Sequence, residues 1–224
     1  MRKKAILQGI SVDYLGAILV VLAGFIAIPY YLAYLSKEEY GLWLAINGVV
    51  LMVALADLAT DQFLTTVTSN DNKFYSEEYA DYLSSILLVK IISAAVVAGI
   101  SSVIFVFLAS LVDVVVDFQD SAKITFALGI LALVCGIFIN TISTILYARH
   151  HYSLINAYTN FFSIASTVGT IFLLKLDYGI VAFPIAQIIS TIFQGIIFFA
   201  VLQRRFPHIH LKVKNFKFVG KSEI

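Results

Sequence analysis

Three charged side chains, Asp57, Asp61 and Lys90, fall inside or at the ends of long apolar stretches of this sequence. A charge at the centre of a membrane costs about 2.5 to 3.5 kcal/mol on insertion scales. Such residues are therefore expected to pair with one another or to mark a pathway for a substrate, an ion or a proton. They are the first place in this chain where chemistry is expected.

The depths of two of these charges nearly coincide. Asp57 lies 16 residues after Gly41, about 24 Å along one helix, and Lys90 lies seven residues after Leu83, about 10 Å back along the next. An Asp57–Lys90 pair between adjacent antiparallel helices is therefore geometrically allowed. It is either a static contact that orients two helices or part of a substrate or proton pathway, and both alternatives stay open. Asp61, one turn beyond Asp57, is expected to be a solvated helix end at the inner interface.

A polar stripe is predicted on the last apolar stretch. Gln187 and Gln194 are seven residues apart and share a helical face with Ser190 and Thr191. This face should contact other helices or a wet cavity. Its amides and hydroxyls suit sugar hydroxyls or a diphosphate, and hydrogen bonds between helices would explain them as well. Weaker polar markers in other stretches are Asn47, Asn140, Thr141, Thr144, Asn156, Thr159, Asn160, Ser163 and Ser166.

Six apolar stretches carry these residues. The chain is 60% hydrophobic and 13% charged, with a mean hydropathy of +0.93, whereas soluble domains are about 25% charged. A spanning helix needs about 20 mostly apolar residues, and uninterrupted apolar runs are typical of helices and not of barrel strands. The fold class is therefore predicted to be all-α, a polytopic membrane protein. The predicted spans are 15–35, 41–64, 83–112, 124–147, 154–174 and 179–202.

The distribution of basic residues predicts the orientation. If the N-terminus is cytoplasmic, eleven of the 15 Lys and Arg residues lie in inner connections, while Lys37, Lys123 and Lys175 lie outside and Lys90 lies in a span. This bias places both termini in the cytoplasm. Residues 1–206 are predicted to form the transmembrane unit, and residues 207–224 a basic cytoplasmic tail or linker.

The sequence lacks the motifs that are typical of enzyme active sites and phosphate-binding loops. It holds no glycine-rich phosphate loop and no arrangement typical of a serine or cysteine nucleophile. His150-His151 and the pair His208 and His210 are interpreted as interfacial side chains and not as metal ligands. The chain is therefore not expected to be an enzyme, to hold a metal or cofactor, or to bind nucleic acid.

One motif has a family likeness. Tyr34-Leu35-Ser36-x-x-x-Tyr40-Gly41-Leu42-Trp43, followed by Leu55-x-Asp57-Leu58, resembles the start of bacterial Wzx-type polysaccharide flippases. These belong to the multidrug/oligosaccharidyl-lipid/polysaccharide exporter superfamily. Where that family often continues with Asp-Leu-Gly-Leu, this chain has Asp57-Leu58-Ala59-Thr60-Asp61. We interpret the motif as a family signature more than as a binding site.

The resemblance implies one six-helix lobe of a two-lobe, MATE-like transporter in the bacterial inner membrane. It implies translocation of an undecaprenyl-diphosphate-linked oligosaccharide, with membrane lipids and a missing second lobe or a second copy as further partners. Lys90, Asp57 and Gln187 are the expected cavity residues. The alternatives are a small-molecule exporter of the same superfamily, coupled to protons or sodium, and a membrane scaffold or remnant that transports nothing.

Overall fold

The structure is a computed structural model that describes residues 2–55, 60–70, 74–76, 79–111 and 118–207 of the 224-residue chain. Within these ranges the chain forms helices joined by turns, and no strand. The all-helical prediction is therefore confirmed for the described residues. The elements are α1 (Arg2–Tyr34), α2 (Lys37–Ala54), α3 (Thr60–Ser69), α5 (Tyr79–Leu111), α6 (Gln119–Ala148), α7 (Tyr152–Leu174), the 3-10 helix η3 (Gly179–Val181) and α8 (Ala182–Arg205).

Five of the predicted spans are confirmed as helices that are long and apolar enough to cross a membrane. These are Tyr14–Tyr34, Tyr79–Leu108, Gln119–Ala148, Tyr152–Leu174 and Gly179–Arg205. The remaining predicted span, 41–64, coincides with most of α2 and the start of α3, and residues 56–59 between them lie outside the described residues. The six-span arrangement therefore stays a prediction. Of the predicted tail 207–224, all but residue 207 lies outside the described residues.

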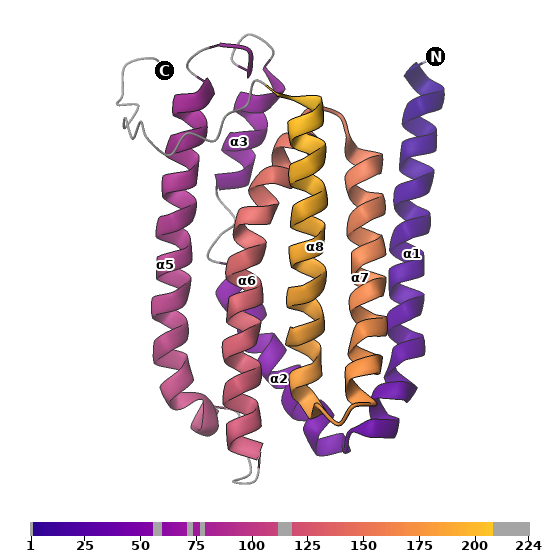
Figure 1. Ribbon diagram of the computed structural model, residues 1–224, viewed down its shortest axis with the longest axis vertical. Coiled ribbons are helices and arrows are strands. Elements are labelled where there is room, and N and C mark those ends of the chain that lie inside the picture. Colours follow the sequence, from indigo (N-terminus) through magenta and orange to yellow (C-terminus); the bar gives the residue numbers. More distant parts are fainter. Residues whose placement is uncertain (1, 56–59, 71–73, 77–78, 112–117, 208–224) are drawn as a thin grey trace.

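The long helices stand side by side as one bundle (Figure 1). α8 packs against both α6 and α7, α1 packs on the far side of α7, and α5 packs against α6. α2 and α3 also lie against α6. α1 begins and α8 ends at the same end of the bundle, which we call the amino end. The turn between α7 and α8 and the start of α2 lie at the opposite, distal end.

A capping box sets the start of α2. The Ser36 hydroxyl accepts a hydrogen bond from the Glu39 backbone N–H at 3.1 Å, and the Glu39 carboxylate accepts one from the Ser36 N–H at 2.8 Å. This reciprocal pair satisfies backbone donors that the first turn of a helix leaves free. The Ser-x-x-Glu spacing within the sequence motif therefore fixes where α2 begins, about two turns before Trp43.

The buried core has two parts. One lies toward the distal end and includes Ile46, Phe126, Leu174 and Phe183. The other lies toward the amino end and includes Leu64, Phe74, Leu146, Phe198 and Leu202. On α6, Ile137 belongs to the first cluster and also lines a cavity. The cavity therefore adjoins the core toward the middle of α6.

Two glycines allow close approach between helices. A Cβ atom at Gly195 of α8 would lie 2.8 Å from Cδ1 and 2.9 Å from Cγ1 of Ile139 on α6. A Cβ atom at Gly16 of α1 would collide with the Asn160 side chain of α7. Small residues at such contacts let helix backbones pack closely in a membrane. The α6–α8 contact therefore depends on the missing side chain at position 195.

We expect Gly195→Val to destabilise the bundle by about 1 to 3 kcal/mol, because an overpacked contact forces helices apart. The midpoint of thermal unfolding of the purified protein in detergent measures this. Gly99→Val is the control, since a Cβ atom there meets nothing within 4 Å. Adding Ile139→Ala to Gly195→Val should recover much of the loss. Equal effects of Gly195→Val and Gly99→Val would contradict the close α6–α8 contact.

Candidate functional site

A buried ion pair joins α3 to α5. The Lys90 ammonium Nζ lies 2.9 Å from Oδ1 of Asp61, and the Lys90 side chain is 0% exposed while that of Asp61 is 35% exposed. Asp61 was expected to be a solvated helix end; it does lie in the first turn of α3 and is partly exposed, but its carboxylate pairs with a buried lysine, which was not expected. Asp57, the predicted partner of Lys90, lies outside the described residues.

Of the two charged groups in this ion pair, the Asp61 carboxylate lies at a cavity and the Lys90 ammonium does not. Asp61 lines a cavity of about 240 Å³, whereas the Lys90 side chain is fully buried. Lys90, predicted as a cavity cation, therefore lies behind the carboxylate that it contacts. A buried charge is tolerated when an opposite charge compensates it. The wall of this cavity thus carries a paired carboxylate.

The cavity that Asp61 lines is formed by residues of α2, α3, α6 and α8. Its polar lining consists of Asp61, Asn140, Gln187 and Thr191, and small or aliphatic side chains of α2 and α6 complete the wall. The residues that line it are Ala54, Asp61, Ala132, Leu133, Gly136, Ile137, Asn140, Gln187 and Thr191. The structure therefore brings Gln187, a predicted cavity residue, to the same cavity as Asp61.

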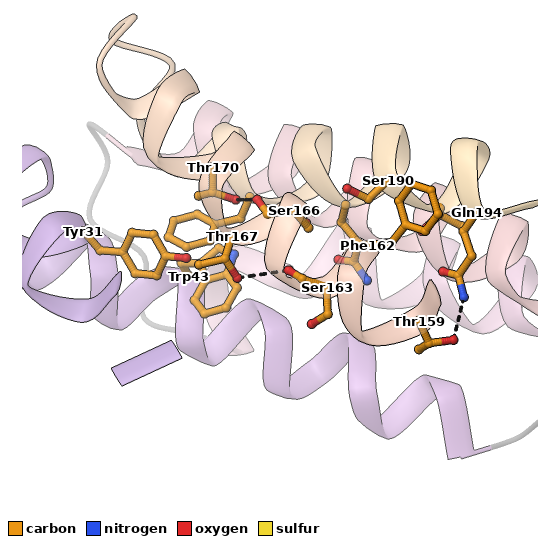
Figure 2. A pocket seen from close by; sticks show the side chains of 13 residues that line it. Tyr31, Trp43, Thr159, Phe162, Ser163, Ser166, Thr167, Thr170, Ser190 and Gln194 are labelled. Carbon is orange, nitrogen blue, oxygen red and sulfur yellow. Dashed lines mark hydrogen bonds between the residues drawn. The ribbon is translucent and has the colours of Figure 1, made fainter. Parts of the chain in front are cut away.

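A larger cavity of about 350 Å³, which we call the hydroxyl groove, lies between α7 and α8. Figure 2 shows its side chains. Gln187 and Thr191 line both cavities, so the two spaces adjoin at α8. The residues that line the hydroxyl groove are Tyr31, Trp43, Thr159, Phe162, Ser163, Ser166, Thr167, Thr170, Phe183, Gln187, Ser190, Thr191 and Gln194.

Hydroxyls and amides form the two long walls of the groove. The predicted stripe of α8, Gln187 to Gln194, lines it in full, so the predicted wet or helix-facing surface is confirmed as a cavity wall. Opposite this stripe, α7 presents a row of hydroxyls at helical spacing from Thr159 to Thr170. The Gln194 amide Nε2 donates to Thr159 Oγ1 at 3.0 Å, which ties the walls together at the end nearer the amino end (Figure 2).

Part of the α7 row is held by its own helix. Thr167 Oγ1 donates to the Ser163 carbonyl at 3.1 Å, and Thr170 Oγ1 donates to the Ser166 carbonyl at 2.9 Å. These bonds use the hydroxyl protons and leave the oxygen lone pairs available as acceptors. Fixed hydroxyls of this kind give the groove a defined polar surface.

Aromatic rings close the distal end of the groove. The Trp43 and Phe183 rings stack with centroids 4.1 Å apart, and Tyr31 meets Phe183 edge to face at 4.9 Å. Tyr40 lies beyond Trp43, with centroids 6.2 Å apart. Tyr40 and Trp43 come from the sequence motif that we interpreted as a family signature and not as a binding site. The structure places the Trp43 ring on the wall of the cavity, and the interpretation of the motif as a family signature stays a prediction.

Several of these residues were missed by sequence reasoning. Thr159, Ser163 and Ser166 were noted as weak polar markers, whereas Thr167 and Thr170, which continue the same face, were not. Their signal was present as hydroxyls three or four residues apart. The aromatic end combines rings from α1, α2 and α8, and no spacing within one helix could predict that they meet.

At the amino end, Arg149 and His151 lie outside the candidate spans. The Arg149 guanidinium lies over the Phe74 ring at 4.4 Å and donates to the Thr68 carbonyl at 3.4 Å. Burial lowers the pKa of His151, and the nearby Arg205, His150 and Arg149 lower it further. The unfolded chain therefore binds a proton more readily at this residue, so folded-state stability falls as the pH drops through its ordinary pKa of about 6.5.

Among the described residues, no group of three His, Cys, Asp or Glu side chains is placed to hold a metal ion.

Removing the acid of the buried pair should cost more than removing both charges. We expect Asp61→Ala to destabilise the protein by an amount at the lower end of about 3 to 5 kcal/mol, because Lys90 loses the carboxylate 2.9 Å from it. The double variant Asp61→Ala with Lys90→Met should be closer to wild type. Thermal unfolding in detergent compares the three proteins. A double variant that is less stable than Asp61→Ala would contradict this account of the pair.

Comparison with known proteins adds the family. A model of the family described as "Polysaccharide biosynthesis protein" matches residues 6–223. Searches of curated proteins and of solved structures found no match. The family model covers nearly the whole chain, including the residues that line both cavities. The chain therefore belongs to the polysaccharide biosynthesis protein family.

Proposed function

We propose that this chain moves a lipid-linked oligosaccharide across the bacterial inner membrane during polysaccharide assembly, as a flippase of the Wzx type. The observation that carries the proposal is a pair of adjoining polar cavities inside a bundle of apolar helices. The family match supports a role in polysaccharide biosynthesis. These cavities would give a polar substrate a route beside the lipid, which a bundle of purely apolar helices would lack.

The difficult step in such a reaction is the passage of the polar head. Sugar hydroxyls and a diphosphate lose their hydrogen bonds with water in hydrocarbon, at a cost of roughly 2 to 7 kcal/mol for each unpaired polar group. The hydroxyl groove offers replacement partners along α7 and α8. The lipid chain needs none and stays in the bilayer. The groove thus lowers the barrier for the sugar units of the head, while the lipid tail remains in the hydrocarbon.

Polar side chains on one side of the groove are exposed within the spans, so we expect other helices to cover that side. Thr159, Ser163 and Gln187 are exposed although they lie within candidate spans, and hydrocarbon cannot satisfy their polar atoms. We propose that a second six-helix lobe covers this side, either from a further segment of a longer chain or from a second copy. The two lobes would rock about the cavity, which opens in turn to each side of the membrane.

The Asp61 carboxylate favours a second candidate function. It lies on a cavity wall and contacts a buried lysine, an arrangement that suits coupling to protons or sodium in a small-molecule exporter. Ion coupling could equally drive the flippase. The two functions differ in what is exported, and export assays separate them.

Deleting the gene from a strain without a second flippase should abolish surface polysaccharide and make lipid-linked repeat units accumulate on the inner leaflet. Polysaccharide blotting measures the first and protease- or lectin-accessible labelling of the lipid-linked pool measures the second. Unchanged surface polysaccharide would contradict the proposal. Altered drug sensitivity with normal polysaccharide would instead favour the small-molecule exporter.

In the same strain, Gln187→Leu should reduce export by about tenfold, because one unpaired polar group costs about 1 to 3 kcal/mol. Ile189→Ala is the matched control on the same helix, since Ile189 is 48% exposed and lines neither cavity. Immunoblots of membranes verify equal insertion. Equal export by the two variants would show that the shared wall of the cavities plays no part in transport.

A further inference from the structure

We propose that the hydroxyl groove binds uncharged sugar units and rejects acidic ones, so that it restricts this protein to neutral glycans. The inference rests on the proposed function, because it names the substrate class of the same site. It concerns the chemistry of the glycan and is independent of how the lipid diphosphate is held.

The first support is the type of group that lines the groove. None of the 13 described residues that line it carries a charge. Its polar members are hydroxyls and amides, which both donate and accept hydrogen bonds. Sugar hydroxyls have the same dual capacity. A neutral saccharide can therefore exchange its bonds with water for bonds with both walls.

The second support is a set of polar side chains that have no hydrogen-bond partner within the described part of the chain. Ser163 and Ser166 on α7 and Gln187, Ser190 and Thr191 on α8 line the groove in this state. Gln194 and Thr159, by contrast, bond to each other. Unpaired polar groups in a membrane interior are costly unless water or a ligand satisfies them. The middle of the groove is thus poised to bond a polyhydroxyl ligand.

The third support is the position of the charges nearby. An acidic sugar would bring a carboxylate into a space whose described lining residues include no cation. Among the described residues lining the adjoining cavity, the charged one is Asp61, which would repel a second carboxylate. Lys90 is fully buried behind it. A desolvated and uncompensated carboxylate is disfavoured far more than a neutral hydroxyl.

The chain carries its own reporter for this site. Trp43 is the single tryptophan of the sequence and lines the groove. Its emission depends on the polarity and packing around the indole. Saccharide binding should therefore change tryptophan fluorescence without an added label.

The test titrates the purified full chain in nanodiscs with neutral trisaccharides and with their uronate counterparts, such as α-1,4-galactotriose and α-1,4-trigalacturonate. We expect a saturable change in Trp43 emission with neutral trisaccharides and at least tenfold weaker binding of the matched uronates. Ser166→Ala with Ser190→Ala should weaken neutral binding about tenfold or more, and Ile189→Ala should leave it unchanged. Uronate binding as tight as neutral binding, or no saturable response to any neutral trisaccharide, would overturn the proposal.

A charge-gain variant tests the cause of the selectivity. Ser163 lies on the exposed edge of the groove, so Ser163→Lys places a cation there with room for its side chain. It should raise uronate affinity at least tenfold, while Ser163→Gln should not. Equal uronate binding by these two variants would show that charge does not set the preference.

The outcome is separable from that of the proposed function. If deletion of the gene does not affect polysaccharide export but the protein binds neutral saccharides selectively, the protein has a neutral saccharide site and does not flip lipids. Normal export together with equal binding of uronates would leave the flippase and remove the selectivity.

Discussion

Hydrocarbon offers no hydrogen-bond partner, so a polar side chain within a span is stabilised by a partner in the bundle or by a polar cavity. Lys90 meets its requirement through a carboxylate 2.9 Å away. Gln194 and Thr159 meet theirs through each other. Five side chains for which the described structure gives no such partner, Ser163, Ser166, Gln187, Ser190 and Thr191, gather on the walls of two adjoining cavities, whereas the unpaired hydroxyls of Ser101 and Thr125 lie outside both. The five polar side chains on the cavity walls thus define where a ligand or water must lie.

The packing of the bundle follows from the same arrangement. Apolar clusters fill the distal and amino ends, and the close α6–α8 contact at Gly195 holds one wall of the groove. The stacked rings of Trp43 and Phe183 close the groove at the distal end. Aromatic rings therefore bound the groove toward the distal end, while Ser163 and Gln187 on its walls are exposed.

The sequence predicted six spans, five of which are confirmed among the described residues, and the polar stripe of α8, because both depend on patterns within one helix. It did not predict that Lys90 contacts Asp61, because that contact joins α3 to α5 and the spacing of residues within one helix does not specify it. The sequence also did not predict the cluster of aromatic rings at the distal end of the groove. Tyr31, Trp43 and Phe183 come from three helices, and their meeting is a tertiary contact that spacing does not encode.

The central claim is that a wet polar groove lies between α7 and α8 inside the membrane. Single cysteines placed in a Cys135→Ala background test it most directly. Ser163→Cys lies on the groove, and Phe161→Cys lies two residues away on the opposite, 62% exposed face of α7. A membrane-impermeant maleimide, applied to both sides of membrane vesicles, should label Ser163→Cys at least tenfold faster than Phe161→Cys. Equal, slow labelling of both would contradict the account, because it would place Ser163 in hydrocarbon like its neighbour.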